Sequence, residues 1–131
     1  MTRPVGITVL AIVALVWGIF HLLLTLLGLA GLGLAASGVA SQYSTGTLVY
    51  ASVSDFVLGA LFLAFGIGAL RLRGWAWTTG VVALGLTVVA EIVSFVHGRD
   101  VLLGIVTVVA SLLALWYLLR ANVRLAFGRA A

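Results

Sequence analysis

The sequence contains no cysteine, no lysine, a single proline and few charged residues of either sign. Without cysteine, disulfides, thiolate metal sites and thiol catalysis are excluded. Charged residues make up 8% of the chain, whereas a soluble domain carries about 25%. Disorder is excluded as well, because 64% of the residues are hydrophobic. Residues 1–131 are therefore expected to form a single integral membrane domain.

Four apolar runs lie between the charged residues and turn-like segments, at 5–27, 48–70, 75–96 and 101–119. A hydrocarbon core about 30 Å thick needs roughly 20 helical residues, so each run suffices for one crossing. Helices satisfy every backbone hydrogen bond internally, and the strict alternation of a membrane barrel is absent. The sequence predicts an all-α fold with four transmembrane helices.

The first run continues into a Gly- and Ala-rich stretch at 28–40. A helix covering 5–40 would be about 54 Å long, which is more than one crossing requires and too little for two. We expect the first helix to extend beyond the bilayer or lie at its interface, and to break near Ser37-Gly38.

Arginine occurs almost entirely on one side of this topology, at Arg3, Arg71, Arg73, Arg120, Arg124 and Arg129. Only Arg99 lies on the other side. By the positive-inside rule, both termini are expected in the cytoplasm and the protein in the plasma (inner) membrane.

The tail at 120–131 predicts a short amphipathic helix on the cytoplasmic side, with Val123, Ala126 and Phe127 toward lipid. Attraction to anionic lipid is worth about 1 kcal/mol per arginine near the surface. Contact with lipid headgroups or a partner is expected at Arg71, Arg73, Arg120, Arg124 and Arg129. Nucleic acid is not an expected partner, because the arginines flank apolar runs.

Small and polar residues recur at spacings of three and four along each run, for example Ala11, Ala14, Gly18, His21, Thr25 and Gly28. In membranes such stripes mark the faces where helices approach one another. A mean spacing near 3.5 predicts a left-handed bundle, and the short connections make consecutive helices antiparallel neighbours. We favour convergence of the stripes within one chain over a dimer interface.

Three ionisable residues fall on these stripes inside the runs: His21, Asp55 and Glu91. At about 1.5 Å of rise per residue, they lie roughly 6–10 Å below the outer surface. An ionisable residue at the membrane centre costs at least about 2.5 kcal/mol and indicates a functional site. The predicted outer-leaflet polar pocket comprises His21, Asp55, Glu91 and Thr107, with Ser52, Ser94 and Ser111 within reach.

Two carboxylates beside an imidazole could bind a cation, relay protons or accept a cationic substrate. The alternative is structural: the carboxylates reach water or bond across helices, and His21 bonds to a neighbouring helix. No HExxH spacing, local Ser-His-Asp arrangement or cofactor motif occurs, so no catalytic residue, metal ligand or cofactor is predicted.

The segments 3–8 (Arg-Pro-Val-Gly-Ile-Thr), 70–77 (Leu-Arg-Leu-Arg-Gly-Trp-Ala-Trp) and 120–127 (Arg-Ala-Asn-Val-Arg-Leu-Ala-Phe) form a pattern. The chain resembles small uncharacterised prokaryotic four-helix membrane proteins, which have an Arg-Pro-x-Gly-Val-Thr-like start and an Arg-x-x-Val-Arg-x-x-Phe-like end. The resemblance implies the topology and no activity, since none is assigned to the group.

The small size and short loops favour a non-catalytic interaction or accessory subunit. Its expected partners are the lipid bilayer and a membrane protein or a second copy of the chain. The alternative is a small transporter or channel-like protein that uses His21, Asp55 and Glu91 for protons, cations or a small cationic substrate.

Overall fold

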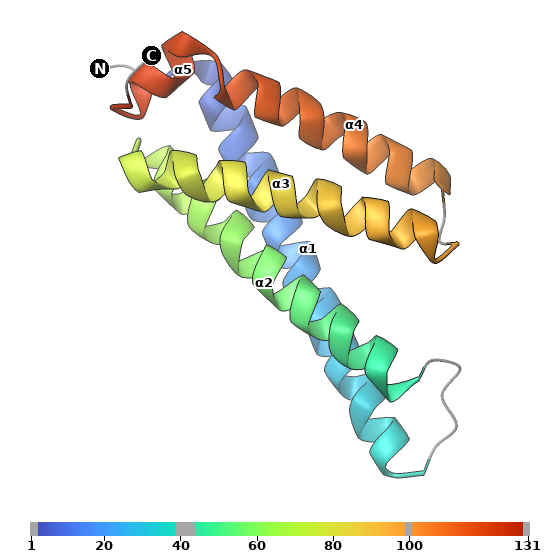
Figure 1. The fold of residues 1–131 in the computed structure, drawn as a ribbon. Coiled ribbons are helices and arrows are strands. Elements are labelled where there is room, and N and C mark those ends of the chain that lie inside the picture. The colour runs from blue at the N-terminus through green and yellow to red at the C-terminus, as the bar shows by residue number, and fades with distance from the viewer. Residues whose placement is uncertain (1–2, 39–43, 99–100, 130–131) are drawn as a thin grey trace.

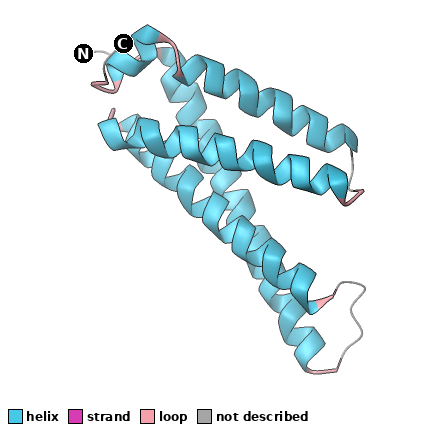
Figure 2. Cartoon of the chain, viewed as in Figure 1, coloured by secondary structure: helices cyan, strands magenta, loops and turns pink. Residues whose placement is uncertain are grey.

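The computed structural model describes residues 3–38, 44–98 and 101–129. In these residues the chain forms helices and no strand, as Figures 1 and 2 show. The helices are α1 (Val5–Ala36), α2 (Thr45–Leu70), α3 (Gly74–Val96), α4 (Val101–Leu118) and α5 (Ala121–Ala126). The first four are long and apolar enough to cross a membrane, which confirms the predicted all-α class and the four spans. Arg99 and the loop residues 39–43 lie outside the described residues.

Helix α1 runs without interruption for 32 residues, about 48 Å. It begins after Pro4, whose fixed φ suits a helix start. It ends at Ser37, where the hydroxyl donates to the Leu34 carbonyl, and Gly38 follows with φ +85°. A left-handed φ of this kind favours glycine and terminates the helix. The predicted break at Ser37-Gly38 is confirmed.

The most extensive helix contact joins α1 and α2, and it depends on glycine. A Cβ atom added at Gly18 would lie 3.0 Å from the Gly59 carbonyl oxygen, and one added at Gly59 would lie 3.0 Å from the Gly18 carbonyl oxygen. Further along the pair, Gly28 packs against the Ser52 side chain. Because lipid supplies no hydrophobic force between helices, such close backbone packing is what holds them together.

Helix α3 contacts α2 on one side and α4 on the other. The Phe65 ring of α2 packs against Gly80 of α3, and the Phe95 ring of α3 packs against Gly104 of α4. Helices α1 and α4 touch where Tyr117 covers Gly6, but they share no extensive contact among the described residues. In Figure 1 the α1–α2 pair diverges from the α3–α4 pair away from the end that carries α5. We call this end the α5 end.

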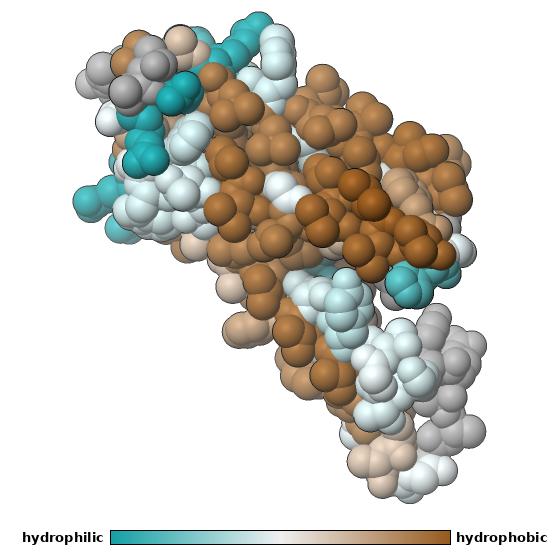
Figure 3. Space-filling view, viewed as in Figure 1, coloured by the Kyte–Doolittle hydropathy of each residue, from teal (hydrophilic) through white to brown (hydrophobic). Residues whose placement is uncertain are grey.

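The predicted small-residue stripes face inward within one chain. On α1 the buried residues include Ala11, Ala14, Gly18 and Thr25. Large aliphatic side chains face outward instead, such as Leu102, which is 75% exposed. Figure 3 shows this apolar outer surface in brown, with hydrophilic residues gathered at the α5 end. An apolar exterior over small inward residues is the pattern expected of helices surrounded by lipid.

The lipid-facing side predicted for the C-terminal segment is wrong. Val123 and Phe127, predicted to face lipid, are 0% and 2% exposed and belong to the same core cluster as Ile7 and Leu118. Helix α5 folds back over the start of α3, where Gly74 lies against the Phe127 carbonyl oxygen. An apolar side chain can pack against lipid or against a protein core, so the amphipathic pattern alone could not show which of the two surrounds Val123 and Phe127.

Replacing Gly59 with leucine is expected to lower the free energy of unfolding by about 1–3 kcal/mol, because the side chain would overpack the α1–α2 contact. Gly85→Leu is the matched control, since a Cβ at Gly85 meets nothing within 4 Å. Thermal unfolding in detergent measures both variants. Equal stability of the two would contradict this account of the helix pair.

Candidate functional site

His21 of α1 and Asp55 of α2 form an ion pair, with 2.8 Å between the imidazole Nδ1 and the carboxylate Oδ1. His21 lies one turn after Gly18, and Asp55 lies one turn before Gly59. The close approach of the backbones at the two glycines therefore brings these side chains into contact. The side chains are 12% and 21% exposed, respectively.

The His21 ring is surrounded by aromatic side chains. It stacks on Phe62 with 6.3 Å between ring centroids and 6° between planes, and it meets Trp17 edge-on at 5.4 Å. A carboxylate only accepts hydrogen bonds, so Nδ1–H donates to Asp55 and Nε2 is left for another partner. Nε2 is buried and has no hydrogen-bond partner among the described residues. An unsatisfied buried polar atom costs about 1–3 kcal/mol.

Glu91 is not part of this pair. Its Oε2 lies on the α4 side of α3, 3.1 Å from the position of a Cβ added at Gly104. Within the described residues, no group of three His, Cys, Asp or Glu side chains could hold a metal ion. The predicted stripes do face inward, but Glu91 faces Gly104 of α4, and no hydrogen bond or ion pair in the described part of the chain joins it to His21 or Asp55.

The predicted hydroxyl groups are also distributed over several contacts. Thr107 donates to the Leu103 carbonyl at 3.0 Å, and Ser94 donates to the Ala90 carbonyl at 2.9 Å. Such bonds within one helix satisfy a hydroxyl without a partner helix. Ser52 is buried against Gly28 and its Oγ has no partner among the described residues. Thr107 and Ser94 are thus bonded within their own helices, whereas Ser52 lies on the α1–α2 contact one turn before Asp55.

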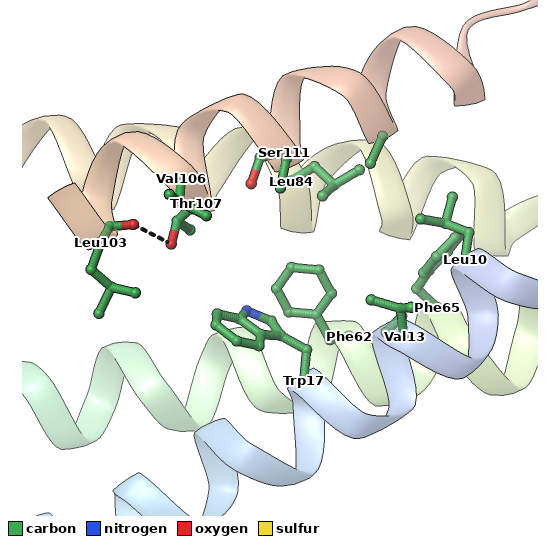
Figure 4. A pocket seen from close by; sticks show the side chains of 13 residues that line it. Leu10, Val13, Trp17, Phe62, Phe65, Leu84, Leu103, Val106, Thr107 and Ser111 are labelled. Atoms are coloured by element: carbon green, nitrogen blue, oxygen red, sulfur yellow. Dashed lines mark hydrogen bonds between the residues drawn. The ribbon is translucent and has the colours of Figure 1, made fainter.

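A groove of about 390 Å³ opens between the four long helices. Trp17 and Phe62, which flank the His21 ring, also form its wall, so the groove and the ion pair share two side chains. Figure 4 shows both rings facing α4 across the groove, where Thr107 and Ser111 project. The remaining lining is apolar and includes Leu10, Val13, Phe65, Leu84, Leu103 and Val106.

Sequence reasoning missed this groove, although it identified Thr107 and Ser111. The signal available was Trp17, a large aromatic residue directly before Gly18 and one turn before His21. Its role depends on the angle between two helix pairs, which residue spacing within one helix does not specify.

The five predicted headgroup arginines lie at the α5 end in two settings. Arg71 and Arg73 are exposed in the turn between α2 and α3. Three are associated with tryptophan rings: Arg120 lies over Trp116, and Arg124 and Arg129 lie over Trp77.

Comparison of the chain with protein-family models, curated proteins and solved structures finds no match. Its function is therefore inferred from its own geometry.

Asp55→Ala is expected to lower the free energy of unfolding by about 1–3 kcal/mol, because His21 would lose its one side-chain partner while remaining buried. Asp55→Asn keeps an accepting oxygen and should lose less. Glu91→Ala is the control, since Glu91 has no ion pair among the described residues. Denaturant unfolding in detergent tests the series, and a larger loss for Glu91→Ala would refute the assignment.

Proposed function

We propose that this protein is an interaction or accessory subunit of the plasma membrane whose groove receives a transmembrane helix of a partner protein. The observation that carries the proposal is the groove itself, which is open, largely apolar and lined by all four long helices. A soluble partner would gain little from an apolar surface placed among membrane-spanning helices, whereas a helix within the bilayer would pack against it.

Topology supports the proposal. An even number of spans would put both ends of the chain on one side of the membrane, and the arginines of the α5 end favour the cytoplasm as that side. The pairing of Gly18 with Gly59 and of Gly28 with Ser52 fits antiparallel helices in a left-handed bundle. The resemblance to small prokaryotic four-helix proteins agrees with the same arrangement.

The α4 wall of the groove is suited to a further helix. It presents small side chains at Ala110, Ser111 and Ala114, which permit close backbone approach. The Ser111 hydroxyl projects into the groove and has no hydrogen bond among the described residues, so it is available to a partner (Figure 4). Helix α4 has the smallest share of buried residues of the four apolar helices, 17%.

A photocrosslinking amino acid at Val106 is expected to capture a partner's membrane helix, because Val106 lines the groove. The same group at Leu113, which is 61% exposed and outside the groove, should react with lipid. Mass spectrometry of the purified products identifies what was captured. A product of twice the chain's mass would make a second copy the partner.

The groove-filling variant Ala110→Trp should abolish the Val106 product, whereas Leu113→Trp should leave it intact. Both variants place a tryptophan on α4, one inside the groove and one outside it, so the comparison tests the groove. Capture of lipid alone at Val106, or persistence of the protein product in Ala110→Trp, would overturn the proposal.

The His21–Asp55 pair favours a second candidate, a small transporter or channel-like protein for protons or cations. An imidazole that donates one nitrogen to a carboxylate and keeps the other unpartnered is a common proton-carrying arrangement. In proteoliposomes, proton flux should fall to background in Asp55→Asn and His21→Gln. Glu91→Gln is the matched control, because Glu91 lies apart from the pair. Absence of flux in the unaltered protein would eliminate this candidate.

A further inference from the structure

Two guanidinium groups converge on one indole ring at the α5 end. The guanidinium carbon of Arg124 lies 5.6 Å from the Trp77 ring centroid, and that of Arg129 lies 5.2 Å from it. The ring is held in place by its Nε1–H, which donates to the Leu118 carbonyl at 2.8 Å. Cation–π attraction favours each arginine individually, but it brings two like charges together.

The backbone at the end of α5 fixes this pairing. Gly128 adopts φ +70°, and the Arg129 N–H donates to the Arg124 carbonyl at 2.9 Å. Together with the bond from the Gly128 N–H to the Leu125 carbonyl, this is a Schellman motif, which reverses the chain after a helix. The motif returns Arg129 to the position beside Arg124. Burial of Val123 and Phe127 anchors the helix beneath.

No acidic side chain neutralises this pair within the described residues, where the one ion pair is His21–Asp55. Glu91 lies near the other end of α3, 14 residues from Trp77, or about 21 Å along the helix. The Arg124 Nε is buried without a hydrogen-bond partner among the described residues. Two guanidinium groups that share one indole ring and lack a counter-charge offer donors for the oxygens of a phosphate.

We propose that Arg124 and Arg129 bind the phosphate of an anionic phospholipid headgroup against Trp77. A lipid is favoured over free phosphate because the site lies where the apolar helices end, beside exposed apolar side chains. Leu125 is 50% exposed and Leu119 is 52% exposed, which provides surface for the acyl chains. The hydrophilic α5 end adjoins the apolar outer surface directly in Figure 3.

Native mass spectrometry of the detergent-purified protein, titrated with phosphatidylglycerol, tests the proposal. Arg124→Gln/Arg129→Gln should weaken binding about tenfold or more, because each lost guanidinium removes a charge-assisted hydrogen bond. Arg71→Gln/Arg73→Gln is the matched control: it removes the same charge from the same end, but from side chains that do not lie over the Trp77 ring, and it should change binding clearly less. Equal losses in the two variants would show general attraction and refute a site.

Arg124→Lys/Arg129→Lys keeps both charges but loses the planar fork, so it should weaken binding several-fold while the charge stays constant. Phosphatidylcholine carries a phosphate without net negative charge and should bind more weakly than phosphatidylglycerol. Equal binding of the two lipids would overturn the proposal. Displacement of phosphatidylglycerol by equimolar inorganic phosphate would do the same, because the site would then belong to a free anion.

The folding of each variant is checked by its helical circular dichroism and melting temperature. If Arg124→Gln/Arg129→Gln unfolds, Arg129→Gln alone remains decisive, because Arg129 is exposed after the end of α5. It should weaken phosphatidylglycerol binding by about threefold or more, consistent with the loss of one charged contact. Unchanged binding in a folded Arg129→Gln protein would overturn the proposal.

Discussion

The close approach of α1 and α2 at Gly18 and Gly59 is the constraint on which the other features of the molecule depend. Lipid is as apolar as the side chains it surrounds, so helices associate in a membrane through tight packing and hydrogen bonds. The two glycines provide the packing, and the His21–Asp55 pair one turn away provides the polar contact. The same contact orients Trp17 and Phe62 toward the groove. The α1–α2 pair therefore provides both the packing that stabilises the fold and the side chains of the candidate functional site.

Much of the fold was predictable because its determinants are local. Run length and hydropathy indicated the spans, Ser37-Gly38 marked the end of α1, and the three- and four-residue spacing identified the inward faces. The placement of Glu91 against Gly104 of α4 was not predictable, since spacing along one helix does not specify which neighbouring helix a side chain meets. The pattern of Val123 and Phe127 could not distinguish a lipid-facing from a protein-facing side. Of the predicted pocket residues, His21 and Asp55 are brought into direct contact.

Several polar side chains in the apolar helices have a hydrogen-bond partner within the protein. Thr25, Thr87 and Ser94 bond to carbonyls of their own helices, so they need no partner helix. His21 and Asp55 satisfy each other across an interface. The fully buried polar atoms left without a bond in the spans, His21 Nε2 and the Ser52 Oγ, both lie along the α1–α2 contact. The arginines that the structure describes lie at the α5 end.

The unequal lengths of the helices have a mechanical consequence. Helix α1 extends about 48 Å over 32 residues, whereas α4 extends about 27 Å over 18 residues. A bilayer core of about 30 Å matches α4 nearly upright, whereas α1 would have to tilt, thicken the bilayer locally or extend beyond it. The divergence of the two helix pairs in Figure 1 has the shape that such tilting requires. The apolar helices therefore differ in length from one side of the protein to the other, so lipid around the four helices would meet unequal hydrophobic lengths.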